Sequence, residues 1–318
     1  MNNDVIYVLF SFFFLPTVYF ILSLHFRRYE HARTKNGTPL NVYLTYQATN
    51  TIAVTYLGIA GIIFYVYQES LNSSIVIPPL YLRSELLEKF LIYPMIFYQF
   101  HSLVLYWLAF IPELGNVSMA LHHVVTLLLG LFSIYPQPYL QGYSVFYFGL
   151  VELSTVFLQG IDLYKNIRYT KLYNESLFQQ FQIFFVISFI SLRVVLWPMI
   201  SVYFWRSSLL LLMNNHAHSK AIVIFSLGAN LYLTFLQFYW GALIARKLYV
   251  FINNSDNNQI FLYNFANITT IIVSKFQNGD QVSVKKSDMT EKEEIGVRVG
   301  VGVQGVEESF EIEEFKSM

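Results

Sequence analysis

The chain has 318 residues, of which 55% are hydrophobic, 18% aromatic and only 13% charged, and its mean hydropathy is +0.46. A soluble domain normally carries about 25% charged residues, so this composition excludes an ordinary soluble protein and favours a membrane protein. The formal net charge of zero gives no reason to expect a nucleic-acid partner, and the absence of cysteine excludes disulfides, thiol nucleophiles and zinc–thiolate sites.

The apolar residues fall into seven blocks, each long enough to cross a bilayer as a helix. The first block is too long for the core of a signal peptide and has no cleavage site, so we expect a retained span. Pro136 and Pro138 separate the fourth block from the fifth, which predicts two helices rather than one. The blocks lie at about 4–26, 49–67, 87–111, 118–135, 139–163, 181–205 and 220–248. The predicted fold is all-α, a multi-pass membrane protein with seven transmembrane helices.

The connecting segments predict how these helices are oriented. Nine Lys and Arg residues lie at or shortly after the ends of the first, fifth and seventh blocks, up to Lys247, against four near the opposite ends of the helices. The positive-inside rule therefore predicts a lumenal N-terminus and a cytosolic C-terminus. Asn72, in the sequon NSS, then falls in a lumenal loop and is a candidate for glycosylation. Residues 251–318 end in a charged, Gly/Val-repetitive stretch, which predicts a largely disordered cytosolic tail.

Several polar residues are expected deep in the membrane. At 1.5 Å per helical residue, Glu152, Arg193 and Gln237 share the bilayer midplane with His101 and Gln99. A charged side chain at this depth costs at least about 2.5 kcal/mol, so we expect the glutamate and the arginine to face each other inside the bundle. Hydrogen bonding between helices is the alternative role for the amide and hydroxyl side chains.

Two adjacent histidines, His122 and His123, lie near the cytosolic end of the fourth block, at a depth of about 8 Å. Acid–base or nucleophilic catalysis and polar packing are both open interpretations. Adjacent helical residues point about 100° apart, so the pair is poorly placed to share a metal ion and we expect no metal site. For the same reason, one histidine should face a cavity and the other a neighbouring helix.

Four segments together resemble the TLC-domain family, over about residues 87–250. They are HHVVTLLLGLFS at 122–133, VELSTVFLQGIDLYKN at 151–166, FFVISFISLRVVLWP at 184–198 and LQFYWGALIARK at 236–247. The resemblance implies that residues 49–250 form a six-helix, barrel-like bundle around a cavity, preceded by a first helix and a basic cytosolic loop at residues 1–48. The residues expected at this cavity are His101, Gln99, Thr155, Gln159, Arg193, Gln237 and Trp240.

The ceramide synthases of this family carry aspartates after the histidine pair, where this chain has Glu152 and Thr155. The departure resembles the branch of TLC-domain-containing proteins that are not synthases. It implies a protein of the endoplasmic reticulum membrane that binds, senses or modifies a long-chain lipid and uses no cofactor. One alternative is an N-acyltransferase that uses acyl-CoA, with His122 or His123 as base or acyl acceptor and Glu152 orienting it. A second alternative is a cargo or translocon adaptor. The expected partner is membrane lipid, and a homo- or hetero-oligomer stays open.

Overall fold

The computed structural model describes residues 3–32, 34, 37–70, 84–107, 117–134, 141–167, 174–213 and 219–253. Asn72 and most of the predicted tail lie outside these residues. Met1–Lys247 form one compact unit, and the end of α10 from Leu248 onward belongs to a second unit. The description below concerns the first unit.

The structured part of this unit is built from seven helical segments, which confirms the all-α, multi-pass fold. They are α1 (Asn3–Phe26) with η1 (Arg27–Tyr29); α2 (Leu40–Ser70); α3 (Glu85–Leu87), η2 (Glu88–Ile92) and α4 (Tyr93–Trp107); α5 (Val117–Phe132); α6 (Gln141–Ser144), η4 (Val145–Leu150) and α7 (Glu152–Asn166); α8 (Glu175–Phe189), η5 (Ile190–Leu196) and α9 (Trp197–Met213); and α10 (Lys220–Asn253). Within the described residues, five segments are long and apolar enough to cross a membrane, and α5 is a shorter apolar helix.

Two helices begin earlier than the apolar blocks predict, because capping residues fix their starts. The Asn174 side chain accepts a hydrogen bond from the Leu177 backbone N–H at 3.1 Å, so α8 begins at Glu175 rather than near residue 181. Ser84 accepts from the Leu87 N–H at 3.3 Å and starts α3 in the same way. α2 begins at Leu40 rather than near residue 49, because its first turns are helical but polar.

Three of the helical segments contain a π turn, in η2, η4 and η5. A π turn inserts an extra residue and rotates the side chains that follow, and such turns are frequent at functional sites. Arg193 lies inside η5, and Glu152 lies two residues after η4 ends. Both π turns therefore help to set which way the two charged side chains point.

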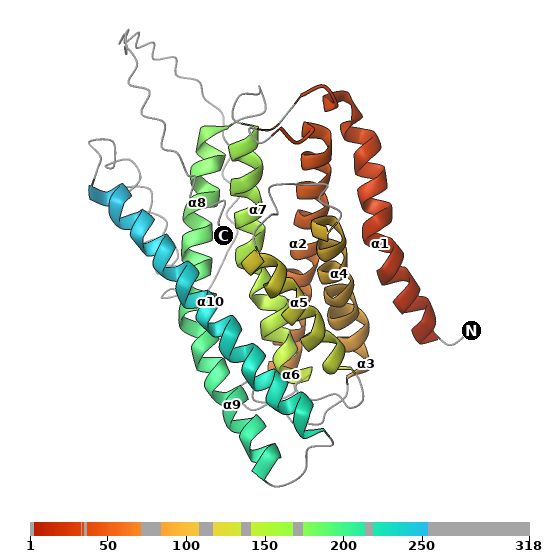
Figure 1. Ribbon diagram of the computed structural model, residues 1–318, viewed down its shortest axis with the longest axis vertical. Helices are drawn as coiled ribbons and strands as arrows, with labels where there is room; N and C mark the ends of the chain where they lie inside the picture. Colours follow the sequence, from red (N-terminus) through yellow and green to blue (C-terminus); the bar gives the residue numbers. More distant parts are fainter. Residues whose placement is uncertain are drawn as a thin grey trace, which may run out of the picture. The chain divides into compact units, whose positions relative to one another are not determined.

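The closest helix packing surrounds α2, which contacts η4 and α7 along its length (Figure 1). At its crossing with η4, a Cβ on Gly61 would lie only 2.5 Å from the Leu150 backbone nitrogen, and a Cβ on Gly149 only 2.5 Å from the Gly61 Cα. One turn earlier, Gly58 meets Leu153. Small residues let the two backbones touch, as is common for helices packed in a membrane.

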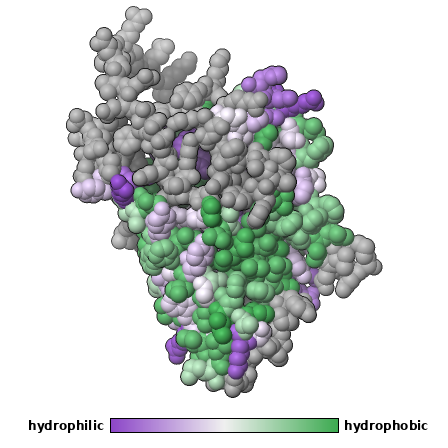
Figure 2. All heavy atoms as spheres, viewed as in Figure 1, coloured by the Kyte–Doolittle hydropathy of each residue, from purple (hydrophilic) through white to green (hydrophobic). Residues whose placement is uncertain are grey.

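The surface and the interior have the polarity of a membrane protein. Figure 2 shows hydrophobic side chains over the middle of one face, and the exposed residues include Phe20, Ile63, Val202 and Phe235. The interior holds fully buried amides instead, such as Gln99 and Gln237, each 1% exposed. Lipid cannot satisfy such groups, so they gather inside the bundle.

α10 crosses in front of the segment of α8 and α9 (Figure 1) and is joined to α9 by two indole hydrogen bonds. Trp197 Nε1 donates to Thr234 Oγ1 at 2.9 Å, and Trp205 Nε1 donates to Asn230 Oδ1 at 2.7 Å. On the α5 side the contact is made by rings, with Phe132 and Phe225 edge to face at 5.3 Å. Large side chains hold these helices apart and leave a cavity between them.

Candidate functional site

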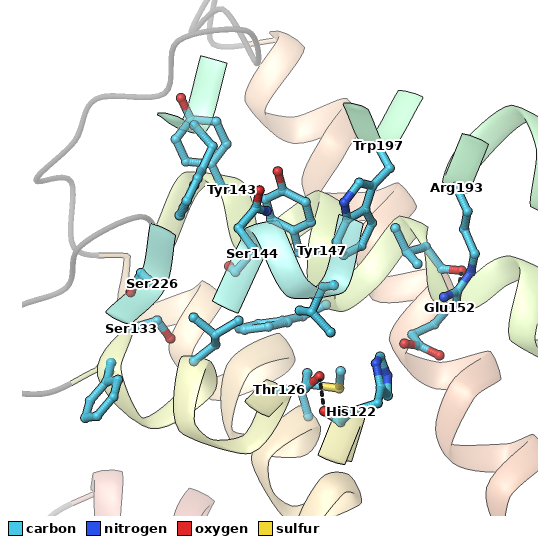
Figure 3. Close-up of a pocket in the computed structure, with 18 residues that line it drawn as sticks. His122, Thr126, Ser133, Tyr143, Ser144, Tyr147, Glu152, Arg193, Trp197 and Ser226 are labelled. Atoms are coloured by element: carbon cyan, nitrogen blue, oxygen red, sulfur yellow. Dashed lines mark hydrogen bonds between the residues drawn. The ribbon is translucent and has the colours of Figure 1, made fainter. Parts of the chain in front are cut away.

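The cavity lies between α5, the α6–η4–α7 segment, the η5–α9 segment and α10 (Figure 3). Its volume is about 60 Å³, room for a few waters or part of an alkyl chain, since one water needs about 10–15 Å³ on this scale. Its wall is formed by Met95, His122, Thr126, Leu129, Phe132, Ser133, Tyr143, Ser144, Tyr147, Phe148, Val151, Glu152, Arg193, Trp197, Phe204, Ser226, Asn230 and Leu233.

The cavity is elongated and follows α5. Its wall on this helix runs from His122 to Ser133, a rise of about 16 Å at 1.5 Å per residue. The middle is aromatic: the Tyr147 and Trp197 rings lie 4.6 Å apart, and Tyr147 and Phe204 lie 6.0 Å apart, both edge to face. The two ends are polar, so the cavity is an apolar passage between two hydrogen-bonding regions.

Arg193 dominates the first polar end, where its guanidinium donates four hydrogen bonds. Its Nε donates to Ser154 Oγ at 2.7 Å and its Nη2 to Thr155 Oγ1 at 2.9 Å, both on α7. Its Nη1 donates to Gln237 Oε1 on α10 at 3.2 Å, and Nη2 also reaches the Val151 carbonyl at 3.3 Å. Arg193 is therefore the residue that ties α7, η5 and α10 together.

Glu152 faces the same space as Arg193, and both side chains are buried and border the cavity (Figure 3). Among the described residues, no ion pair within 4.0 Å joins them. Their charges interact across a short gap, and Thr155, which accepts from Arg193, also lies beside the carboxylate. The Glu152 carboxylate is thus held near the guanidinium without being locked to it.

The two histidines have different surroundings. His122 borders the cavity, its ring packs edge to face on Trp240 at 5.8 Å, and its buried Nδ1 has no hydrogen-bond partner. His123 instead points to α4, where its Nδ1 is hydrogen-bonded to Gln99 Oε1. His122 therefore presents a ring nitrogen without a partner at the cavity, whereas His123 joins α5 to α4.

Ser133 and Ser144 mark the second polar end, beside a buried network that the sequence analysis did not single out. Gln141 Nε2 donates to Glu88 Oε1 at 2.6 Å and to the Ser133 carbonyl at 3.0 Å, and Gln141 Oε1 accepts from the Ser84 N–H at 2.9 Å. Gln141 thus joins the starts of α3 and α6 to the end of α5. Glu88 sits in the π segment η2, but nothing in the spacing of the sequence marks it as buried.

The other residues expected at the cavity lie around it rather than in its wall. Thr155 and Gln237 hold Arg193, Gln99 holds His123, and Trp240 packs on His122. His101 lies further away, with its ring 6.0 Å from that of Tyr19 on α1, and Gln159 is in α7 with its Oε1 buried. Ser154 was missed, although it lies three residues after Val151 and next to Thr155, both of which also bind Arg193.

The first polar end is suited to hydrogen bonding and proton transfer. It combines a guanidinium, a carboxylate and an imidazole, and two buried donors nearby, Gln237 Nε2 and Trp240 Nε1, have no partner. Within the described part of the chain, no three His, Asp or Glu side chains gather closely enough to hold a metal ion. The polar head of an amphiphile would find donors, an acceptor and a titratable ring here.

Comparison with known families gives one match. The sequence model of the TLC domain matches residues 4–246, which includes α1 as well as the segments that carry the motifs. Comparison with curated proteins gives no match, and neither does comparison with solved structures.

Proposed function

The chain belongs to the TLC-domain family, whose members are membrane proteins linked to lipid metabolism or lipid sensing, and on this basis we propose that it binds a single-chain lipid in the cavity along α5. The observation that carries the proposal is the cavity itself, an aromatic passage with the buried Arg193 and Glu152 and the partly buried His122 at one end. Ligand sites commonly combine an apolar lining with a few placed polar groups.

The length of the cavity matches one alkyl chain, and its volume of about 60 Å³ holds part of such a chain. A wall of about 16 Å along α5 corresponds to roughly 12 extended carbons, because a carbon–carbon bond of about 1.5 Å advances the chain by roughly 1.3 Å. The aromatic side chains at its middle would contact the chain from several sides. The polar head would lie at Arg193, within reach of the unpartnered His122 Nδ1 and Gln237 Nε2.

The lipid experiment uses a clickable, photoreactive single-chain lipid added to the purified protein in nanodiscs. In Leu233→Trp, a bulky side chain enters the cavity from α10, because Leu233 is buried in its wall. The matched control is Leu231→Trp on the same helix, because Leu231 is 58% exposed on the outer surface. We expect crosslinking to fall at least about tenfold in the first variant and to stay unchanged in the second, since only the first removes the space.

Two results would contradict this proposal. One is equal crosslinking in both variants, which would place the lipid on the outer surface. The other is a crosslinked peptide that maps away from α5, η4, α9 and α10. Both variants are first compared with the unchanged protein by size-exclusion chromatography, so that misfolded protein is not counted as loss of binding.

Acyl transfer is a second candidate function, favoured by the unpartnered His122 Nδ1 at the cavity. In this reaction the nitrogen of a long-chain amine attacks the carbonyl carbon of an acyl-CoA thioester. A C–N bond forms, the C–S bond breaks, and His122 takes the amine proton and passes it to the leaving sulfur, so that CoA leaves as its thiol. Glu152 and Arg193 would orient the reacting groups at the same end of the cavity.

The paired histidine variants test this second candidate. Purified protein is incubated with acyl-CoA and a long-chain amine, and the amide product is measured by mass spectrometry. If the reaction is catalysed, His122→Ala should lose about 10²–10⁴-fold in rate, as expected for removal of a general base. Absence of product from well-folded unchanged protein would leave lipid binding as the function.

We also propose the endoplasmic reticulum as the location, on the basis of the family resemblance, with a lumenal N-terminus and a cytosolic C-terminus, on the basis of the charge bias of the loops. A C-terminal epitope tag should be reached by antibody after selective permeabilisation of the plasma membrane. Detection only after the endoplasmic reticulum is opened would reverse the orientation. The adaptor alternative depends on the tail, which lies outside the described residues.

A further inference from the structure

A second set of buried and partly buried polar side chains lies on α2 and on the two helices that pack against it, α4 and α7, outside the wall of the cavity. We call it the inlet cluster, and its members are Asn41, Tyr43, Gln47, Asn50, His101, Ser102, Gln159 and Asp162. They lie toward the end of the bundle where α2 begins and α7 ends. The same end carries Arg27, Arg28 and Lys165.

Six atoms of the inlet cluster are buried and have no hydrogen-bond partner. They are Asn41 Oδ1, Gln47 Oε1, Asn50 Oδ1, His101 Nδ1, Ser102 Oγ and Gln159 Oε1. The side chains of Gln47, Asn50 and Ser102 are at most 4% exposed. An unpaired polar group in such a place costs about 1–3 kcal/mol, so six of them in a dry interior would be a large penalty.

The members of the cluster lie at similar levels of the bundle, because α4 and α7 both pack against α2 in a fixed register. Tyr43 donates to the Asp162 carbonyl at 3.3 Å, and Gly58 meets Leu153, so α2 and α7 run antiparallel. This pairing places Gln47 and Asn50 at the level of Gln159. On the α4 side, Leu105 packs with Tyr43 and Tyr46, which brings Ser102, about one turn before Leu105, to the level of Asn50.

Along α2, the cluster has the basic end of the bundle on one side and an apolar core on the other. Asn41 lies in the first turn of α2, at the basic end of the bundle, and Asn50 lies about 14 Å deeper along the helix. Beyond Asn50 the same face of α2 becomes apolar with Val54 and Leu57, both fully buried. On α7, the stripe that holds Asp162 and Gln159 continues to Thr155, which binds Arg193.

We propose that the inlet cluster is a water-filled inlet from the basic end of the bundle toward the Arg193 end of the cavity. Water donates to the amide oxygens and can both donate to and accept from the serine and the imidazole, so one ligand satisfies all six atoms. A buried water typically makes two to four such bonds, which neighbouring amides on three helices provide. Through this inlet, water and protons would reach the Arg193 end of the cavity without crossing its aromatic middle.

Substituted cysteines test the inlet directly, because the chain has no cysteine of its own. Ser102→Cys and Asn50→Cys place a thiol in the cluster, and Val54→Cys places one about a turn deeper on the same face of α2. Each variant in nanodiscs is treated with a small charged methanethiosulfonate, which reacts with the hydrated thiolate. We expect the two cluster thiols to react at least about tenfold faster than Cys at position 54.

Ser102→Cys is nearly isosteric, so it keeps the test valid even if Asn50→Cys fails to fold. All thiols are also labelled after unfolding in sodium dodecyl sulfate, which shows that each is intact. If Ser102→Cys labels as slowly as Val54→Cys in folded protein, the cluster is dry and the proposal is wrong. The test uses no lipid ligand, so its result does not depend on whether the cavity binds one.

Discussion

The interface of α2 with η4 differs from the interface of α10 with α5 and α9 in what lies between the helices. At the first, Gly61 and Gly149 bring two backbones into contact and leave no room for side chains. At the second, the indoles of Trp197 and Trp205 and the ring of Phe132 hold the helices apart. Close packing fixes a rigid half of the bundle, and the wider spacing of the other half leaves the cavity.

Arg193 connects the two halves, and its loss should have the largest effect. In Arg193→Leu, four hydrogen bonds to α7 and α10 disappear and the buried Glu152 loses its compensating charge. We expect a loss of about 3–5 kcal/mol in the free energy of unfolding. The readout is the fraction of a fluorescent fusion that remains monodisperse after heating, measured by size-exclusion chromatography.

The matched control is Arg206→Leu, because Arg206 is exposed in the same helix. The double variant Arg193→Leu/Glu152→Gln should be less destabilised than Arg193→Leu alone, since it removes the uncompensated charge. Equal destabilisation of the single and double variants would show that the hydrogen bonds matter and the paired charge does not.

The close half should be most sensitive to a single methyl group. In Gly61→Ala the new Cβ would lie 2.5 Å from backbone atoms of η4, so the helices must separate. We expect a loss of about 1–3 kcal/mol, as for overpacked cores. Gly228→Ala on α10 is the control: its Cβ meets nothing within 4 Å, and alanine there should stabilise the helix by about 0.5–1 kcal/mol. Similar stability of both variants would contradict the close contact.

The two histidines of α5 should differ in how much each stabilises the protein. His123→Ala leaves the buried Gln99 Oε1 without its partner and should cost about 1–2 kcal/mol. His122→Ala should cost less, because His122 Nδ1 has no partner to lose. The heating assay described above measures both. A larger loss for His122→Ala would mean that its packing against Trp240 matters more than the bond between α4 and α5.

The smallest effect is expected where α10 meets α9. Trp197→Phe removes the hydrogen bond to Thr234 and keeps most of the ring, so we expect a loss of about 1 kcal/mol. The same change should clearly alter lipid crosslinking on α10 while the free energy of unfolding changes little, since α10 forms one wall of the cavity. An effect on stability as large as that of Gly61→Ala would show that the wider half is as closely packed as the other.

The helices could be predicted from the sequence because lipid requires long apolar segments with satisfied backbones. Their starts were less predictable where polar residues are helical, as at Asn41 to Asn50 of α2 and after Asn174 of α8. Hydropathy depends only on composition, so it cannot show that the polar side chains at these helix starts face other helices. The inlet cluster occupies one of these stretches, so it could not be recognised before the helices were placed.

The site was predictable to the extent that depth and charge determine it. A shared depth indicated that Glu152 and Arg193 belong together, and the structure places both at one cavity. Depth alone could not distinguish residues in the cavity wall from residues behind it. Gln99, Gln237 and His101 were predicted at the same depth as Glu152 and Arg193, but they contact different neighbours. The π turns in η4 and η5 also change the helix faces that a regular 3.6-residue period predicts.

The contact between Gly61 and Gly149 also constrains the order in which the protein assembles. The two glycines are far apart in the chain, so the contact can form only after the segment that contains η4 has been synthesised and inserted. Until then, α2 stays in the bilayer with a bare glycine face and with the amide oxygens of Gln47 and Asn50 without a partner. The neighbour that is synthesised before α2 and packs against it in the folded protein is α1.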